Sequence, residues 1–143
     1  MIEQIIVGTL VICGTVVLHV LFINTLTLWL TKNGQWIASP PIMTKRTIVL
    51  IVMVLWLVLG LTVSSWLWAV VFLLNDVFTD LESALYFTVV TFTTLGYGDI
   101  TLEKDWRLLA SFTAANGLII VGLNTAFLVE ALTRINSAQE SSR

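Results

Sequence analysis

Long uninterrupted apolar runs decide what this chain can fold into. Three of them, residues 5–30, 47–74 and 106–132, each exceed the roughly 20 residues that a helix needs to cross the hydrocarbon core of a bilayer. Of the 143 residues, 57% are hydrophobic and 11% are charged, and a soluble core of this size could not bury so much apolar surface. We therefore predict an all-α membrane protein with three transmembrane helices.

A fourth apolar stretch, residues 81–92, is too short to span the membrane. Its length suits a segment that enters the membrane and leaves it on the same side. Thr79 and Glu82 have the spacing of a capping box, which predicts a helix start at this point. Asn-Gly and Pro-Pro pairs within residues 32–46 predict a loop between the first two spans.

A secretory signal peptide is the main alternative for the first apolar run. Glu3 lies where a signal peptide carries positive charge, and the run is longer than the hydrophobic region of such a peptide. We therefore expect a helix that stays in the mature protein. Cys13, the one cysteine, lies in this run, so an intramolecular disulfide and a thiolate metal site are excluded.

The charged residues predict a topology. One side of the membrane receives five Lys or Arg against two acids, whereas the other receives two against seven. By the positive-inside rule the first side is cytoplasmic, which places the N-terminus outside, the C-terminus inside and the short segment at the outer face. Tryptophans near the span ends fit aromatic belts, namely Trp29, Trp36, Trp66, Trp68 and Trp106.

The segment after the short stretch, Thr94-Leu95-Gly96-Tyr97-Gly98, predicts a cation pathway. Irregular backbone at membrane depth is tolerated only where it is buried in protein or lines a water-filled path. The two glycines lack a Cβ, so they permit unusual dihedrals that aim successive carbonyls the same way. Stacked rings of carbonyl oxygens replace the hydration shell of a cation, and the Thr94 hydroxyl can add a further oxygen.

Residues 81–99 resemble the pore helix and selectivity filter of the potassium channel superfamily, whose consensus is Thr-Val-Gly-Tyr-Gly-Asp. The order of span, half-helix, filter and span extends the resemblance to residues 47–134 and leaves the first span outside it. Leu95 stands where valine is commonest, a change that retains the carbonyl. The resemblance implies a homotetramer with K⁺ as the permeant ion and no other cofactor. It places K⁺ at Thr94, Leu95, Gly96 and Tyr97.

The resemblance also implies roles for the residues around the filter. Tyr86 and Phe87 are similar to the aromatic pair that packs around the filter of the family. Val90 stands where some two-helix bacterial channels have a glutamate paired with the aspartate after the filter, so that carboxylate pair is missing here. The expected filter-support residues are Thr93, Asp99, Tyr86, Phe87 and Val90.

The third span resembles the inner helix of the family. Gly117 falls at the position of its hinge glycine, and Gly122 is a second candidate, although small residues in membrane helices equally permit close packing. With about 100° per residue, one helical stripe would face the pore. Its members are Leu118, Val121, Thr125, Val129 and Leu132, with Thr125 as the polar member and Val129 or Leu132 as candidates for an inner gate.

Polar residues inside the spans are candidates for function, because polar groups are costly in lipid. For Asn116 and Asn124 we prefer hydrogen bonds to a neighbouring subunit. For His19 we prefer a structural hydrogen bond within the helix bundle over pH sensing. Glu130 and Arg134, four residues apart, predict a helical ion pair rather than a gate latch.

The sequence thus predicts a potassium channel that conducts K⁺ passively in a plasma membrane, and the small chain suggests a prokaryotic one. No catalytic constellation is present, so we do not expect an enzyme. No partner beyond other copies of the chain, the bilayer and K⁺ is expected, and no nucleic acid. A weakly selective cation channel and a non-conducting accessory subunit remain alternatives. The expected organisation is residues 1–46 for the first helix and a cytoplasmic loop, 47–134 for the pore domain (outer helix 47–74, pore helix 80–92, filter 93–99, inner helix 106–132) and 135–143 for a cytoplasmic tail.

Overall fold

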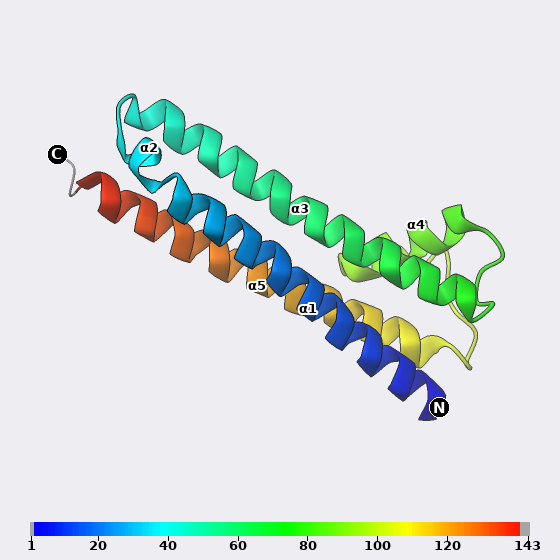
Figure 1. The fold of residues 1–143 in the computed structure, drawn as a ribbon. Coiled ribbons are helices and arrows are strands. Elements are labelled where there is room, and N and C mark those ends of the chain that lie inside the picture. The colour runs from blue at the N-terminus through cyan, green and yellow to red at the C-terminus, as the bar shows by residue number, and fades with distance from the viewer. Residues whose placement is uncertain (1, 141–143) are drawn as a thin grey trace.

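Three long helices lie side by side in an elongated bundle, and a short helix packs at one end (Figure 1). The structure is a computed structural model that describes residues 2–140 of the chain. Over this range it contains five helices and no strand. They are α1 (Ile2–Lys32), α2 (Gly34–Ala38), α3 (Ile42–Leu74), α4 (Leu81–Phe92) and α5 (Arg107–Glu140).

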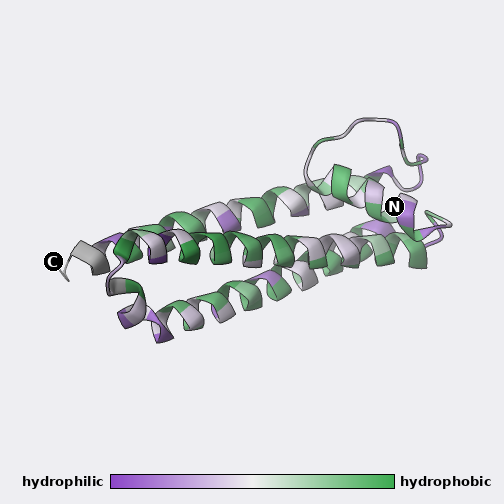
Figure 2. Ribbon diagram, turned by 90° about the horizontal axis from the view of Figure 1, so that it is seen from above, coloured by the Kyte–Doolittle hydropathy of each residue, from purple (hydrophilic) through white to green (hydrophobic). Residues whose placement is uncertain are grey.

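The three long helices, α1, α3 and α5, are each long and apolar enough to cross a membrane. Apolar residues cover most of their length (Figure 2), and many large apolar side chains are exposed on the outside of the bundle. Exposure of that kind is favourable in lipid and unfavourable in water. The predicted all-α, multi-pass membrane protein is therefore confirmed.

The helices extend further than the apolar runs. The predicted loop over residues 32–46 contains α2, and α3 begins directly after Pro41, whose restricted φ suits the start of a helix. Lys45 in the first turn of α3 holds α2, because its ammonium donates to the Trp36 carbonyl at 3.0 Å and to the Ser39 hydroxyl at 2.6 Å. It also lies 4.8 Å from the centre of the Trp36 ring.

At the other end of the chain, α5 continues well past residue 132, where the apolar run stops. Polar residues prolong this helix, and the hydroxyls of Thr133 and Ser137 donate to carbonyls four residues earlier at 2.9 and 3.1 Å. The predicted tail over residues 135–143 is thus helical up to Glu140, and its last three residues lie outside the described range.

The start of α4 differs from the predicted capping box. Asp80, not Thr79, is the N-cap, and its carboxylate accepts a hydrogen bond from the Ser83 backbone N–H at 2.7 Å. This bond holds the pKa of the Asp80 carboxyl below its ordinary value. Aspartate caps a helix better than threonine, and its negative charge is favourable at a helix N-terminus.

Two apolar clusters, one at each end of the bundle, hold the helices together. The cluster near α2 consists of Leu26, Ile37, Val49, Met53, Leu57, Ala131 and Ile135. The cluster near α4 consists of Trp68, Phe72, Phe87, Phe92, Leu102, Leu109 and Ile120. Because the second cluster joins α3 and α5 to α4, it fixes the short helix on which the candidate site is built.

Candidate ion pathway

The filter segment starts as the C-terminal cap of α4. Thr93 is the C-cap, and Thr94 follows with a φ of 58°. The Thr94 N–H donates to the Thr91 carbonyl and the Leu95 N–H donates to the Val90 carbonyl, both at 3.0 Å. These two bonds, around a left-handed residue, make a Schellman motif. The filter therefore leaves α4 in a direction that backbone hydrogen bonds determine.

Thr94 occupies a backbone conformation that a β-branched residue rarely adopts. Glycine is the usual residue at this position of a Schellman motif, and left-handed backbone costs an ordinary residue roughly 1–2 kcal/mol. Sequence reasoning missed this feature, because threonine gives no signal for a positive φ. The one indication of a positive φ in the sequence was the position of Thr94 directly after the expected end of a helix. Strained backbone conformations are common at functional sites.

Left-handed backbone recurs at every second residue of the segment. Gly96 has a φ of 54° and Gly98 a φ of 79°, whereas neither Leu95 nor Tyr97 has a positive φ. No atom lies within 4 Å of the place where a Cβ would stand at either glycine, so these positions need glycine for its conformation rather than for space. The predicted dihedral freedom of the two glycines is thus used in the structure.

A hydrogen bond ties the end of the filter back to α4. The Tyr86 hydroxyl donates to the Asp99 carboxylate at 2.6 Å. This bond raises the pKa of the Tyr86 hydroxyl and lowers the pKa of the Asp99 carboxyl. Two residues predicted to support the filter are therefore in direct contact. Behind them, a cavity of about 400 Å³ lies between α4, the filter segment and the start of α5.

The other predicted support residues take separate places. Phe87 is buried in the cluster near α4 and makes an edge-to-face contact with Phe72 at a centroid distance of 5.4 Å, so it anchors α4 on α3. Val90 is buried, and its carbonyl also accepts the Gly96 N–H at 3.2 Å. The Thr93 hydroxyl donates to the Val89 carbonyl of the last helical turn at 2.7 Å.

The structure gives Gly117 a packing role. A Cβ there would overlap the carbonyl oxygen of Phe92 and lie 3.0 Å from the Phe92 Cα. Since Phe92 is the last residue of α4, this contact presses α5 against the base of the filter. Gly122 differs, because no atom lies within 4 Å of its Cβ position. Close packing, one of the two roles open for Gly117, is what the structure shows.

The predicted pore stripe of α5 lies mainly on the surface of the single chain. Leu118, Val121 and Val129 are exposed, as is Thr125, whose hydroxyl donates to the Val121 carbonyl at 2.9 Å. Leu132 is half-buried. Four of the five residues are therefore free to face a pore or another subunit.

The intramembrane asparagines contact the first helix of their own chain. The Asn116 amide donates to the Thr15 hydroxyl at 2.6 Å, and His19 Nε2 lies 2.5 Å from Asn124 Oδ1. The expected bonds to a neighbouring subunit are therefore wrong for these two contacts, because α1 packs along α5 and supplies the partners itself. The structural hydrogen bond predicted for His19 is confirmed.

Near the other end of α5, the predicted ion pair is confirmed. Arg134 Nε lies 2.6 Å from Glu130 Oε1, and both side chains are exposed. Among the described residues, no group of three or more His, Cys, Asp or Glu side chains could hold a metal ion. Residues 94–98 of the filter segment carry no carboxylate, so the oxygens that they offer are backbone and hydroxyl oxygens.

Comparison with known proteins assigns the chain to a family. The model of the family described as "Ion channel" matches residues 51–134, from α3 through the filter to α5. This chain belongs to the ion channel family. The resemblance to potassium channels that the sequence predicts is confirmed, and channels of this family are transporters rather than enzymes. The matched region excludes α1 and α2.

The chain is also similar to part of a much longer channel protein. The potassium voltage-gated channel protein Shal of Drosophila melanogaster is 32% identical over 59 residues. Those residues are 41% of this chain and 10% of the relative, so the channel spans about a tenth of that protein. No solved structure matches the chain.

Proposed function

We propose that the channel conducts K⁺ passively and selectively through a filter built from residues 94–98. The observation that carries the proposal is the left-handed backbone at Thr94, Gly96 and Gly98, directly after the C-terminus of a half-length helix. Alternation of this kind lets successive carbonyls point to one side, where they can replace the water of a cation. The K⁺ positions lie at Thr94, Leu95, Gly96 and Tyr97, with carbonyl oxygens as the main ligands.

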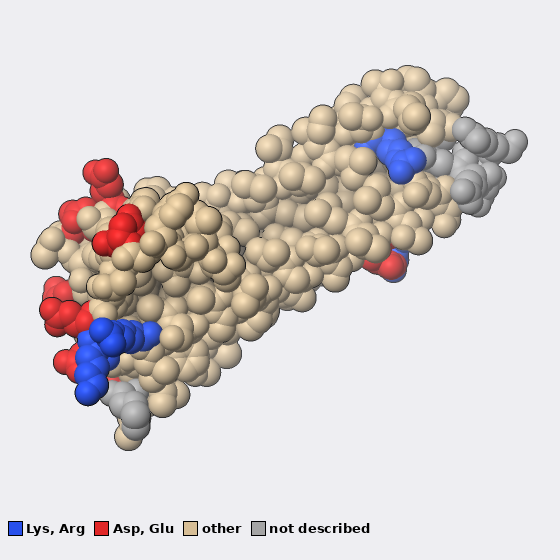
Figure 3. Space-filling view, turned by 180° about the vertical axis from the view of Figure 1, so that it is seen from behind, with Lys and Arg blue, Asp and Glu red and all other residues tan. Residues whose placement is uncertain are grey.

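The charges around the filter support a cation rather than an anion. The C-terminal end of α4 carries a partial negative charge and leads into the filter. Asp99 follows the filter with an ionised carboxylate that the Tyr86 hydroxyl stabilises. Acidic side chains gather at the end of the bundle that carries α4, which raises the local cation concentration (Figure 3).

We infer a homotetramer because one chain supplies one filter strand. Leu95 and Tyr97 are 55% and 68% exposed in the single chain, although both belong to the segment that would surround the ion. The exposed stripe of α5 supports the same conclusion. Cyclic symmetry would bring four such strands together around one axis and cover these side chains.

The same charges support a topology. The end of the bundle with α4 and the filter would face outward, and the end with α2, Lys45 and Arg46 would face the cytoplasm. The N-terminus would then lie outside. The plasma membrane of a prokaryote stays a prediction.

Ion flux into liposomes that contain the purified channel alone tests the function. We expect flux of K⁺ and Rb⁺ but little of Na⁺ and Li⁺. Gly96→Ala should abolish the flux, because left-handed backbone costs alanine roughly 1–2 kcal/mol in every filter strand and its relief would turn the carbonyls away from the ion. Gly14→Ala is the matched control, since this helical glycine of α1 has no atom within 4 Å of its Cβ position.

Each other result favours a different function. Equal flux of Na⁺ and K⁺ would favour a weakly selective cation channel. Absence of flux from both wild type and the Gly14→Ala control would favour a non-conducting accessory subunit. Flux that survives in Gly96→Ala would contradict the carbonyl filter.

A further inference from the structure

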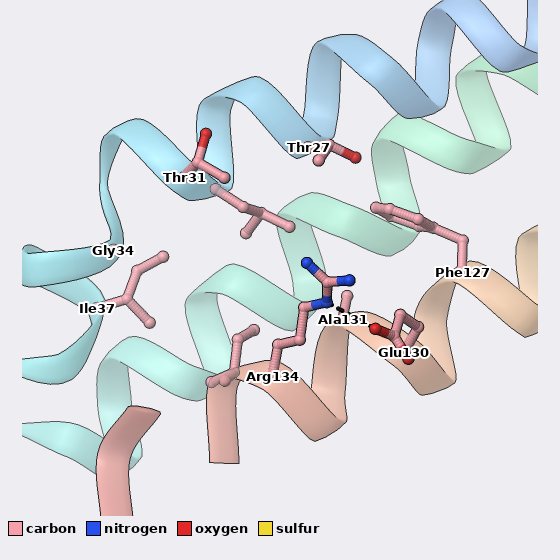
Figure 4. Close-up of a pocket in the computed structure, with 10 residues that line it drawn as sticks. Thr27, Thr31, Gly34, Ile37, Phe127, Glu130, Ala131 and Arg134 are labelled. Atoms are coloured by element: carbon pink, nitrogen blue, oxygen red, sulfur yellow. Dashed lines mark hydrogen bonds and ion pairs between the residues drawn. The ribbon is translucent and has the colours of Figure 1, made fainter. Parts of the chain in front are cut away.

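We propose that a cavity between α1, α2 and α5 binds an anionic phospholipid. The cavity has a volume of about 340 Å³ and lies at the end of the bundle opposite the filter. Figure 4 shows α1 and α5 as its two long walls, with Ile37 of α2 at one end. This volume is within the range of small-ligand sites.

The walls of the cavity suit an acyl chain. The lining surface is mostly apolar, and it includes the side chains of Leu30, Ile37, Phe127, Ala131 and Ile135. Two threonines of α1 also face it, but their hydroxyls already donate to carbonyls of their own helix at 2.9 Å. Water needs several polar partners to stay in a cavity, and this lining offers few of them. An apolar chain is therefore the better occupant.

The rim of the cavity suits an anionic headgroup. Arg134 lines it and is exposed, and its Nε is bonded to Glu130 Oε1 at 2.6 Å. A guanidinium has five N–H donors in a planar fork, so the groups beyond Nε can bind two phosphate oxygens. The Glu130 carboxylate opposes an anion, but it uses one of the five donors and lies toward one side of the guanidinium (Figure 4).

Further positive charges lie near the cavity. α1 ends in Lys32, and Lys45 and Arg46 lie in the first turns of α3 at this end of the bundle. Trp29 and Trp36, both exposed, also lie here and suit the interface between headgroups and acyl chains. Basic pockets between transmembrane helices select anionic headgroups at such a depth. Apolar walls and a basic rim together indicate a phospholipid rather than a free anion.

The position of the cavity gives such a lipid a structural role. Two of its walls, α1 and α2, lie outside the family match, and the third is the stretch 127–135 of α5, which overlaps the end of the predicted pore stripe in sequence. A bound lipid would bridge the first helix to the inner end of α5. This inference does not depend on K⁺ selectivity.

Native mass spectrometry of the detergent-purified full chain tests the proposal, with phosphatidylglycerol, phosphatidylcholine and inorganic phosphate as probes. We expect wild type to retain phosphatidylglycerol in preference to the other two. Arg134→Gln should weaken this retention by roughly fivefold, the effect of one charge near an anionic headgroup. Ala131→Leu should also weaken it, because the larger side chain fills part of the cavity. Lys32→Gln removes an exposed charge at the same end that does not line the cavity, so its loss of phosphatidylglycerol binding should be clearly smaller than that of Arg134→Gln.

Four results would overturn the proposal. Equal losses in Lys32→Gln and Arg134→Gln would mean general surface attraction, and unchanged binding in Ala131→Leu would place the lipid elsewhere. If phosphatidylglycerol is not retained in preference to phosphatidylcholine and phosphate, the cavity is not a binding site for an anionic phospholipid. A lower oligomeric state in Ala131→Leu, read from the same spectra, would mean that a second copy of the chain fills the cavity.

Discussion

The carbonyl oxygen of Phe92 occupies the space in which a side chain at position 117 would have to begin. Phe92 ends α4 and Gly117 lies in α5, so backbone meets backbone directly beneath the filter. No rotamer change could relieve a collision with a main-chain atom. The contact therefore sets the distance between α5 and the base of the filter.

We expect Gly117→Ala to lower the free energy of unfolding by about 3 kcal/mol or more, because overpacking here requires a backbone shift. Gly122→Ala is the control, since its Cβ has open space. Thermal unfolding in detergent and K⁺ flux would measure both variants. If Gly117→Ala is as stable as Gly122→Ala, the close approach is wrong.

Removal of the Tyr86 hydroxyl should loosen the outer end of the filter. Tyr86→Phe keeps the ring but removes the hydrogen bond to Asp99. We expect K⁺ flux to decay faster and Na⁺ exclusion to weaken, with no change in the helical content. The comparison is with Tyr97→Phe, whose hydroxyl has no hydrogen bond among the described contacts of the single chain. The prediction fails if the two variants conduct alike.

The same bond predicts a dependence on acid pH. The Tyr86 hydroxyl lowers the pKa of the Asp99 carboxyl, so the bond stabilises the filter above the unfolded pKa of about 3.9 and is lost as the pH falls through the lower folded value. Wild type should thus keep its flux to a lower pH than Tyr86→Phe. Flux measured in steps from neutral pH downward would check this. Identical acid limits for the two proteins would contradict it.

Replacement of Thr94 by glycine should stabilise the folded protein. Its φ of 58° costs a β-branched residue energy that glycine avoids, so Thr94→Gly should raise the free energy of unfolding by up to about 1 kcal/mol. The same change removes the Thr94 hydroxyl, which can add a further oxygen to the ion pathway, so conduction should fall. Thr93→Gly, at a φ of −81°, should destabilise instead. A destabilised Thr94→Gly would argue against the Schellman geometry.

The contact between His19 and Asn124 should behave as a coupled pair. His19→Leu or Asn124→Leu alone leaves a polar group without its partner and should cost about 1 kcal/mol of stability. The double variant should recover part of this loss. Denaturation in mixed micelles would give the coupling energy, with exposed Asn24→Leu as the control. Strict additivity of the two single losses would mean that the pair is not formed.

The features that follow from a clear sequence pattern were predictable. Apolar length predicts α1, α3 and α5, and the glycine spacing predicts the filter with its left-handed backbone at Gly96 and Gly98. Helix ends were less predictable, because Asp80 competed with Thr79 as N-cap and α5 continues beyond the apolar run. Packing between distant segments could not be predicted, and the partners of Asn116 and Asn124 in α1 depend on it.

The two polar contacts of α1 have a consequence for its alignment in the membrane. Apolar helices in lipid gain little from one axial position over another, since lipid tails satisfy their surfaces equally well. Thr15 and His19, one turn apart, bind Asn116 and Asn124 of α5, and such bonds tolerate neither a slide of one turn nor a rotation of the helix. The first helix is thereby held at one height and one orientation, and α2, which follows it after a single residue, is held at that height as well.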